Sequence, residues 1–191
     1  MRAASLAAAS DTIVALSSAP GSSLRAIVRL SGTRAFSIVE SVFQPQDASA
    51  RVSFGQVCLD RSELEFPAVR YQFQESRSYT GELLVELHLV GSPPLVEALL
   101  EELEARGARA AGPGEFTRRA FLSGRLDLAQ AEAVCALVSS SGEAQRRQAM
   151  NTLSGGPSRV IHDLIDSCKE VAALWVAALD FAEEEDIEED T

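Results

Sequence analysis

"GPGEFTRRAFLSGRLDLAQAEAV", residues 112–134, marks the point where the character of the chain changes. Before this stretch, strand and helix patterns alternate, whereas after it apolar residues recur only at helical spacing. Glycine and proline open the stretch, and Arg118, Arg119 and Arg125 follow closely. We therefore predict an α+β part, a mixed sheet with helices, followed by an all-helical segment.

The first part carries strand patterns at 11–17, 24–32, 51–60, 64–73 and 78–91. In the second of these, Leu24, Ala26, Val28 and Leu30 alternate with other residues and are expected on one face of the sheet. Helical spacing predicts helices at 33–43 and 93–107, the second with proline at its start and glycine at its end. The predicted α+β domain spans residues 1–117.

The last third contains apolar positions at helical spacing, the longest series lying between residues 160 and 180. We assign residues 118–183 to part of a helical domain, and residues 184–191 to an acidic tail or linker. The apolar stripe of the last helix is wider than two short helices can cover. An additional helix, a second subunit or a further part of the chain is expected to cover it.

Composition excludes several classes of function. Basic residues number 17 against 28 acidic ones, for a formal net charge of -11, so this segment is not expected to bind nucleic acid directly. Three scattered cysteines indicate neither a disulfide framework nor a zinc site, and suggest reduced thiols. No apolar run is long enough to span a bilayer, so we expect no membrane partner and a cytoplasmic location.

Motifs for self-sufficient catalysis are missing from the sequence. The single lysine, Lys169, follows a cysteine, which is incompatible with a P-loop, so we expect no GTP site in this chain. His88 and His162 lie far apart in the sequence, and neither is part of a typical metal-ligand pattern, so we expect no metal site. We predict no catalytic residues and no complete active site, and leave enzyme activity open.

Glu86 lies in the middle of an apolar strand, on the face that alternation also gives to Leu84 and His88. A buried carboxylate costs several kcal/mol unless it is paired or bound to a ligand. A glutamate on the solvent side of an amphipathic strand is the simpler alternative. Arg29 is likewise either a solvated strand arginine or part of a site, and Arg125 is either a site residue or a local partner of Asp127.

Several blocks resemble one family of proteins. "DTIVALSSAPGS" (11–22), "IVRLSG" (27–32), "SYTGELLVELH" (78–88) and "PGEFTRRAFLSGRLDLAQAEAV" (113–134) are similar to the N-terminal region of the tRNA modification GTPases MnmE, also called TrmE. The resemblance covers about residues 11–183. It implies a tetrahydrofolate-binding-like N-terminal domain that forms a homodimer and binds 5-formyl-tetrahydrofolate or another one-carbon tetrahydrofolate. A helical domain follows it, into which the family's GTPase domain is inserted.

The resemblance also implies partners and a site. The family modifies the wobble uridine of certain tRNAs together with an FAD-dependent partner enzyme, and this segment would touch tRNA only indirectly. Arg29, Glu86 and Arg125 fall where the family contacts its folate. A carboxylate can accept paired hydrogen bonds from the pterin ring, and arginines suit the polar edge or the glutamate tail of the cofactor.

Two segments depart from the family pattern. Residues 22–25 read "SSLR" where the family has small residues after a Pro-Gly pair, and residues 90–92 read "VGS" in place of "HGG". These departures leave an alternative to folate binding. In that alternative the chain is a divergent short paralogue that acts as a dimerisation or scaffolding protein with a decayed folate pocket.

Overall fold

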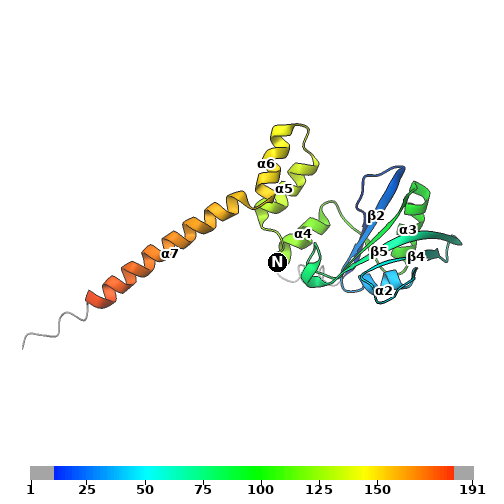
Figure 1. Cartoon of the computed structure of the whole chain (residues 1–191), viewed down its shortest axis with the longest axis horizontal. Coiled ribbons are helices and arrows are strands. Elements are labelled where there is room, and N and C mark those ends of the chain that lie inside the picture. The colour runs from blue at the N-terminus through cyan, green and yellow to red at the C-terminus, as the bar shows by residue number, and fades with distance from the viewer. Residues whose placement is uncertain (1–10, 183–191) are drawn as a thin grey trace, which may run out of the picture. The chain divides into compact units, whose positions relative to one another are not determined.

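The structure is a computed structural model that describes residues 11–182. The described residues divide into two compact units, 11–127 and 128–182, of which Figure 1 labels the main elements. The sequence placed a boundary between residues 117 and 118, whereas the structure keeps residues 118–127 with the sheet. The expected tail at 184–191 lies outside the described residues.

The first unit is built on one mixed sheet, as the sequence predicted. Its strands are β1 (Ile13–Leu16), β2 (Ser23–Ser31), β3 (Phe43–Pro45), β4 (Val52–Leu59), β5 (Leu64–Phe73), β6 (Leu84–Gly91) and β7 (Arg109–Ala110). They lie in the order β3-β4-β5-β6-β2-β1-β7, and all neighbouring pairs are antiparallel except β1 and β7. The long central strands β5, β6 and β2 place side chains of distant segments next to one another.

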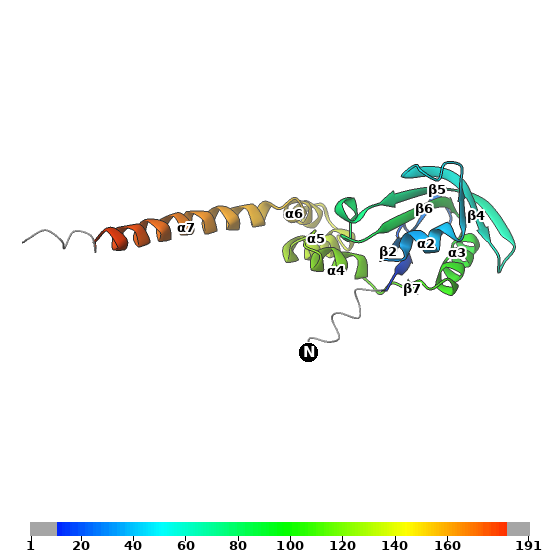
Figure 2. The same cartoon turned by 90° about the horizontal axis from the view of Figure 1, so that it is seen from below.

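Two helices, α2 (Ala35–Glu40) and α3 (Pro93–Ala105), cover one face of this sheet (Figure 2). The core between them includes Val28, Leu87 and Leu99, each fully buried. Each such aliphatic side chain stabilises the fold by roughly 1.5–3 kcal/mol through loss of contact with water. We call the other side of the sheet, which α2 and α3 leave uncovered, the open face.

The helix α4 (Glu115–Leu122) begins within the opening stretch of sequence and belongs to the first unit. Its Arg119 is only 8% exposed and forms ion pairs with Asp11 at 2.6 Å, Glu82 at 3.0 Å and Glu115 at 3.3 Å. Arg109 pairs with Asp11 and Glu115 at 2.7 Å each. This network joins α4 to the segment before β1, to β7 and to the segment before β6, which explains why the first unit extends past residue 117.

The second unit consists of α5 (Leu128–Val138), α6 (Glu143–Leu153) and α7 (Gly156–Ala182). α5 and α6 pack on each other, with Ala133 and Ala149 buried. Along α7 the apolar stripe is exposed, including Leu164 at 64% and Trp175 at 69%, so α5 and α6 do not cover it, as expected. Among the described residues, no helix is both long enough and apolar enough to cross a membrane.

Candidate functional site

Arg29 and Glu86 form an ion pair on the open face of the sheet. The register sets Arg29 of β2 opposite Glu86 of β6, which in turn faces Tyr71 of β5. Nε of Arg29 donates a hydrogen bond to Oε1 of Glu86 at 2.9 Å, and Nη2 lies 2.7 Å from the same oxygen in the ion pair. The Glu86 side chain is only 16% exposed, so it is not the freely solvated glutamate of the simpler alternative.

His88 is the second partner of Glu86. Its Nε2 lies 3.0 Å from Oε2, and because a carboxylate only accepts, this nitrogen carries the proton. The imidazole also packs on the ring of Tyr71, with ring centroids 4.4 Å apart. The Nδ1 atom is buried and has no hydrogen-bond partner within the described part of the chain.

The pKa of Glu86 lies below its ordinary value. Burial is the largest single influence and raises this pKa, but the hydrogen bonds from His88 and Arg29, together with the charge of Arg29, outweigh it. The carboxylate is therefore ionised at neutral pH. A half-buried, ionised acceptor on a sheet face can recognise a group of paired N–H donors.

Two aromatic rings hold the Arg29 guanidinium in place. Its central carbon lies 5.7 Å from the ring centre of Tyr79 and 5.6 Å from that of Phe116, within the range of cation–π attraction. Tyr79 is fixed in turn, because its hydroxyl lies 3.0 Å from Oγ1 of Thr117 on α4. The network around Arg119 that anchors α4 thus also supports the position of Arg29.

Arg125 makes different contacts from the other two predicted site residues. It is exposed, its Nη2 donates to the backbone carbonyl of Glu75, and its side chain lies beside Gly81. The structure therefore brings Arg29 and Glu86 into contact and attaches Arg125 to the segment 75–81 instead. Tyr79, which lies under Arg29, belongs to the same segment.

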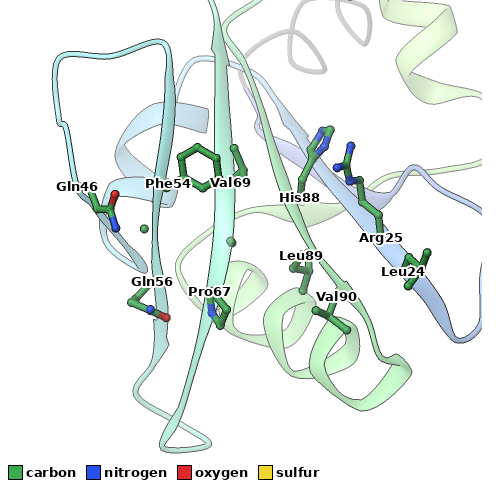
Figure 3. A pocket seen from close by; sticks show the side chains of 12 residues that line it. Leu24, Arg25, Gln46, Phe54, Gln56, Pro67, Val69, His88, Leu89 and Val90 are labelled. Carbon is green, nitrogen blue, oxygen red and sulfur yellow. The ribbon is translucent and has the colours of Figure 1, made fainter.

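A hollow of about 330 Å³ adjoins His88 on the open face (Figure 3). This volume is at the lower end of the range of ligand pockets, roughly 300–1,000 Å³. Its walls combine apolar side chains with a few polar ones: Leu24, Phe54, Pro67, Val69 and Val90, with Arg25, Gln46, Gln56 and His88. The site therefore has a charged end at Arg29 and Glu86 and a mostly apolar end in the hollow.

The two segments that depart from the family pattern meet at this hollow. Ser23 pairs with Gly91 across β2 and β6, and Leu24, Arg25 and Val90 line the hollow itself. A Cβ atom on Gly91 would lie 2.7 Å from the carbonyl oxygen of Ser23, so glycine alone fits here. The departures thus change one end of the site and leave Arg29 and Glu86 untouched.

Sequence reasoning missed His88, Tyr79 and Phe116 as members of the site. The alternation of β6 had placed His88 on the same face as Glu86, and this was a signal for their contact. Nothing in the sequence indicated that Tyr79 and Phe116 would flank Arg29. Among the described residues, no cluster of three or more histidine, cysteine or acidic side chains could hold a metal ion.

Comparisons with known proteins agree with the resemblance. Residues 12–125 match the family described as GTP-binding protein TrmE N-terminus, and residues 128–191 match the MnmE helical domain. The chain is similar to proteins named tRNA modification GTPase MnmE. It is 43% identical over 180 residues to that of Halorhodospira halophila (94% of this chain, 38% of the relative), and 42% over 179 residues to that of Thermus thermophilus (91% and 41%). It is 35% identical over 186 residues to that of Parabacteroides distasonis (93% and 40%).

Proposed function

We propose a function for this chain from the premise that it belongs to the MnmE (TrmE) family, of which it carries the N-terminal and helical domains. The chain spans about two fifths of the length of the curated relatives it matches. In our proposal it binds 5-formyl-tetrahydrofolate, or another one-carbon tetrahydrofolate, and forms a homodimer. It serves the modification of wobble uridine in tRNA, with GTP hydrolysis carried out by a domain outside this sequence.

The observation that carries the proposal is the Arg29–Glu86 pair beside the hollow. The pterin ring offers two neighbouring N–H donors, and an ionised carboxylate accepts such a pair. Mostly apolar walls with a few convergent polar groups suit the rest of a cofactor of this size. Arg125, which is hydrogen-bonded to the segment 75–81 that carries Tyr79, would take the polar edge or the glutamate tail of the cofactor.

The homodimer is supported by apolar side chains on the open face. Leu24 is 99% exposed, Phe54 64%, Val90 57% and Val52 49%. Apolar side chains gathered on one face of a sheet are typical of an interaction surface. A second copy of the chain that covers this face would also close the hollow from the solvent side.

Partners and location follow from the family and remain part of the proposal. We propose an FAD-dependent partner enzyme in tRNA modification and a cytoplasmic location. Because acidic residues dominate the chain, we propose that tRNA is contacted only indirectly, through other domains or the partner.

Isothermal titration calorimetry with 5-formyl-tetrahydrofolate tests the site. We expect Glu86→Gln and Arg29→Ala each to abolish measurable binding while the circular dichroism spectrum is unchanged. Glu97→Gln, an exposed position on α3 at the covered face, is the matched control and should bind as the wild type does. Unchanged affinity in both site variants would refute the assignment.

The second candidate is a dimerisation or scaffolding protein with a decayed folate pocket. The observation in its favour is that both family departures, residues 22–25 and 90–92, meet at the hollow. A thermal-shift titration with reduced folates separates the two candidates. If no folate raises the melting temperature while light scattering shows a dimer, the scaffold is the correct function.

A further inference from the structure

A second hollow, of about 360 Å³, lies farther along β5 than the hollow beside His88. Its volume is also at the lower end of the range of ligand pockets, roughly 300–1,000 Å³. Val52, Tyr71 and Phe73 give it apolar and aromatic walls, and Arg51 and Arg77 give it positive charge. Among the described residues that line it, none is acidic. The second hollow therefore combines a surface for a ring or chain with two groups that attract an anion.

The two arginines of the second hollow are not neutralised by the protein. Both are exposed, and within residues 11–182 neither forms an ion pair. By contrast, Arg106, Arg109 and Arg119 of the same unit each pair with at least two carboxylates. The planar donor fork of an arginine matches a carboxylate, so the groups at Arg51 and Arg77 are suited to bind the carboxylates of a ligand.

The register of the sheet places the second hollow close to Glu86. Val52 of β4 pairs with Tyr71 of β5, and Tyr71 pairs with Glu86 of β6. Neighbouring strands are roughly 4.8 Å apart, so the backbone at Val52 lies about 10 Å from the backbone at Glu86. Arg51 directly precedes Val52 in the chain. One ligand of the size of a folate can therefore contact Glu86 with one end and the second hollow with the other.

We propose that the second hollow binds the glutamate tail of the folate, and that Arg51 and Arg77 make the chain prefer folates with several γ-linked glutamates. The inference rests on the proposed function and adds a tail subsite to it. Each further glutamate adds one carboxylate, so a longer tail gains more from two unpaired arginines. Arg125 is hydrogen-bonded to Glu75, two residues before Arg77, and belongs to the same end of the site. The first hollow has a single arginine, Arg25, among mostly apolar walls and suits the tail less well.

Calorimetry with the monoglutamate and the triglutamate of 5-formyl-tetrahydrofolate tests the proposal. The unaltered chain should bind the triglutamate on the order of tenfold more tightly, as expected for two additional exposed ion pairs. Arg51→Gln and Arg77→Gln should each reduce this preference about two- to fivefold, and the double variant should remove it. Because both side chains are exposed, the melting temperature of the ligand-free protein should not change. The preference should also fall as the salt concentration rises.

Arg25→Gln is the matched control, because it removes the same charge from the first hollow. It should leave the preference for the triglutamate intact. If Arg25→Gln removes this preference while Arg51→Gln and Arg77→Gln retain it, the tail lies in the first hollow and the inference is wrong. Titration with a tRNA gives a further check, since two arginines also suit phosphates. If the double variant binds tRNA more weakly but still prefers the triglutamate, the second hollow binds RNA and the inference is overturned.

The failure of this inference differs from the failure of the proposed function. If the unaltered chain binds the monoglutamate and the triglutamate equally well, and Glu86→Gln abolishes both, the folate site is correct and only the tail subsite fails. If the unaltered chain binds neither form, the proposed function fails and this inference fails with it.

Discussion

Replacing Arg119 by methionine should destabilise the sheet unit strongly. Arg119 is 8% exposed, and its guanidinium forms ion pairs with three carboxylates at N–O distances from 2.6 to 3.3 Å. It also donates a hydrogen bond to the backbone carbonyl of Asp11 at 3.0 Å. Removing one partner of a buried ion pair costs about 3–5 kcal/mol, since the remaining charges stay unpaired. We expect the lower end, about 3 kcal/mol, because Arg109 still neutralises Asp11 and Glu115.

Urea unfolding followed by the near-UV circular dichroism of tyrosine is the suitable assay. Both tyrosines of the chain, Tyr71 and Tyr79, lie in the sheet unit and report its unfolding. Asp60→Asn is the matched control: Asp60 is 81% exposed and pairs with Arg106, so its loss should cost under about 1 kcal/mol. If Arg119→Met costs no more than Asp60→Asn, the network does not anchor α4 and the reasoning is wrong.

Three further predictions concern the stability at low pH, the pairing of β2 with β6, and folate binding at the proposed site. The hydrogen bond from Arg109 is the main cause that lowers the pKa of Glu115 from 4.5 to about 2. The ionised Glu115 therefore stabilises the fold fully above about pH 5, and this stabilisation is lost as the pH falls toward 2. Glu115→Gln should flatten a plot of unfolding free energy against pH over this range. Gly91→Ala should cost about 1–3 kcal/mol in urea unfolding, because the new methyl group meets the backbone of Ser23; a smaller cost would show that the strands separate easily. Tyr79→Leu should weaken folate binding several-fold in calorimetry through a looser Arg29, and unchanged binding would show that the cation–π contact does not matter.

The sequence predicted most of the sheet but not its irregular places. Alternation placed Leu24, Ala26, Val28 and Leu30 on one face of the sheet; Ala26, Val28 and Leu30 are buried in the core, whereas Leu24 is 99% exposed. The reason is a shift of register between Ser23 and Ala26, which breaks the alternation at that end of β2. A bulge depends on how two strands pair, and the pattern of one strand does not contain that information.

The candidate site was predictable to a similar extent. Alternation placed Glu86 and His88 on one face, and the resemblance named Arg29 and Glu86, which the structure brings into contact. Arg125 was named on the same grounds, and its side chain contacts the segment 75–81, whose Tyr79 lies against Arg29. The flanking rings of Tyr79 and Phe116 come from segments far apart in sequence, and only the packing of α4 unites them.

The stability of the sheet does not explain why it contains Arg29, Glu86 and His88. A buried ion pair contributes little net stability, since desolvation offsets most of the attraction, and apolar residues of similar size are often at least as stabilising. On the covered face the same strands carry fully buried aliphatic residues, so the sheet folds well with such side chains. Nδ1 of His88, which has no hydrogen-bond partner among residues 11–182, adds a further local cost. Polar, partly buried side chains that lie side by side on one face of a regular sheet reduce its stability. Such a group is typical of a binding site, where the side chains are needed to recognise a ligand.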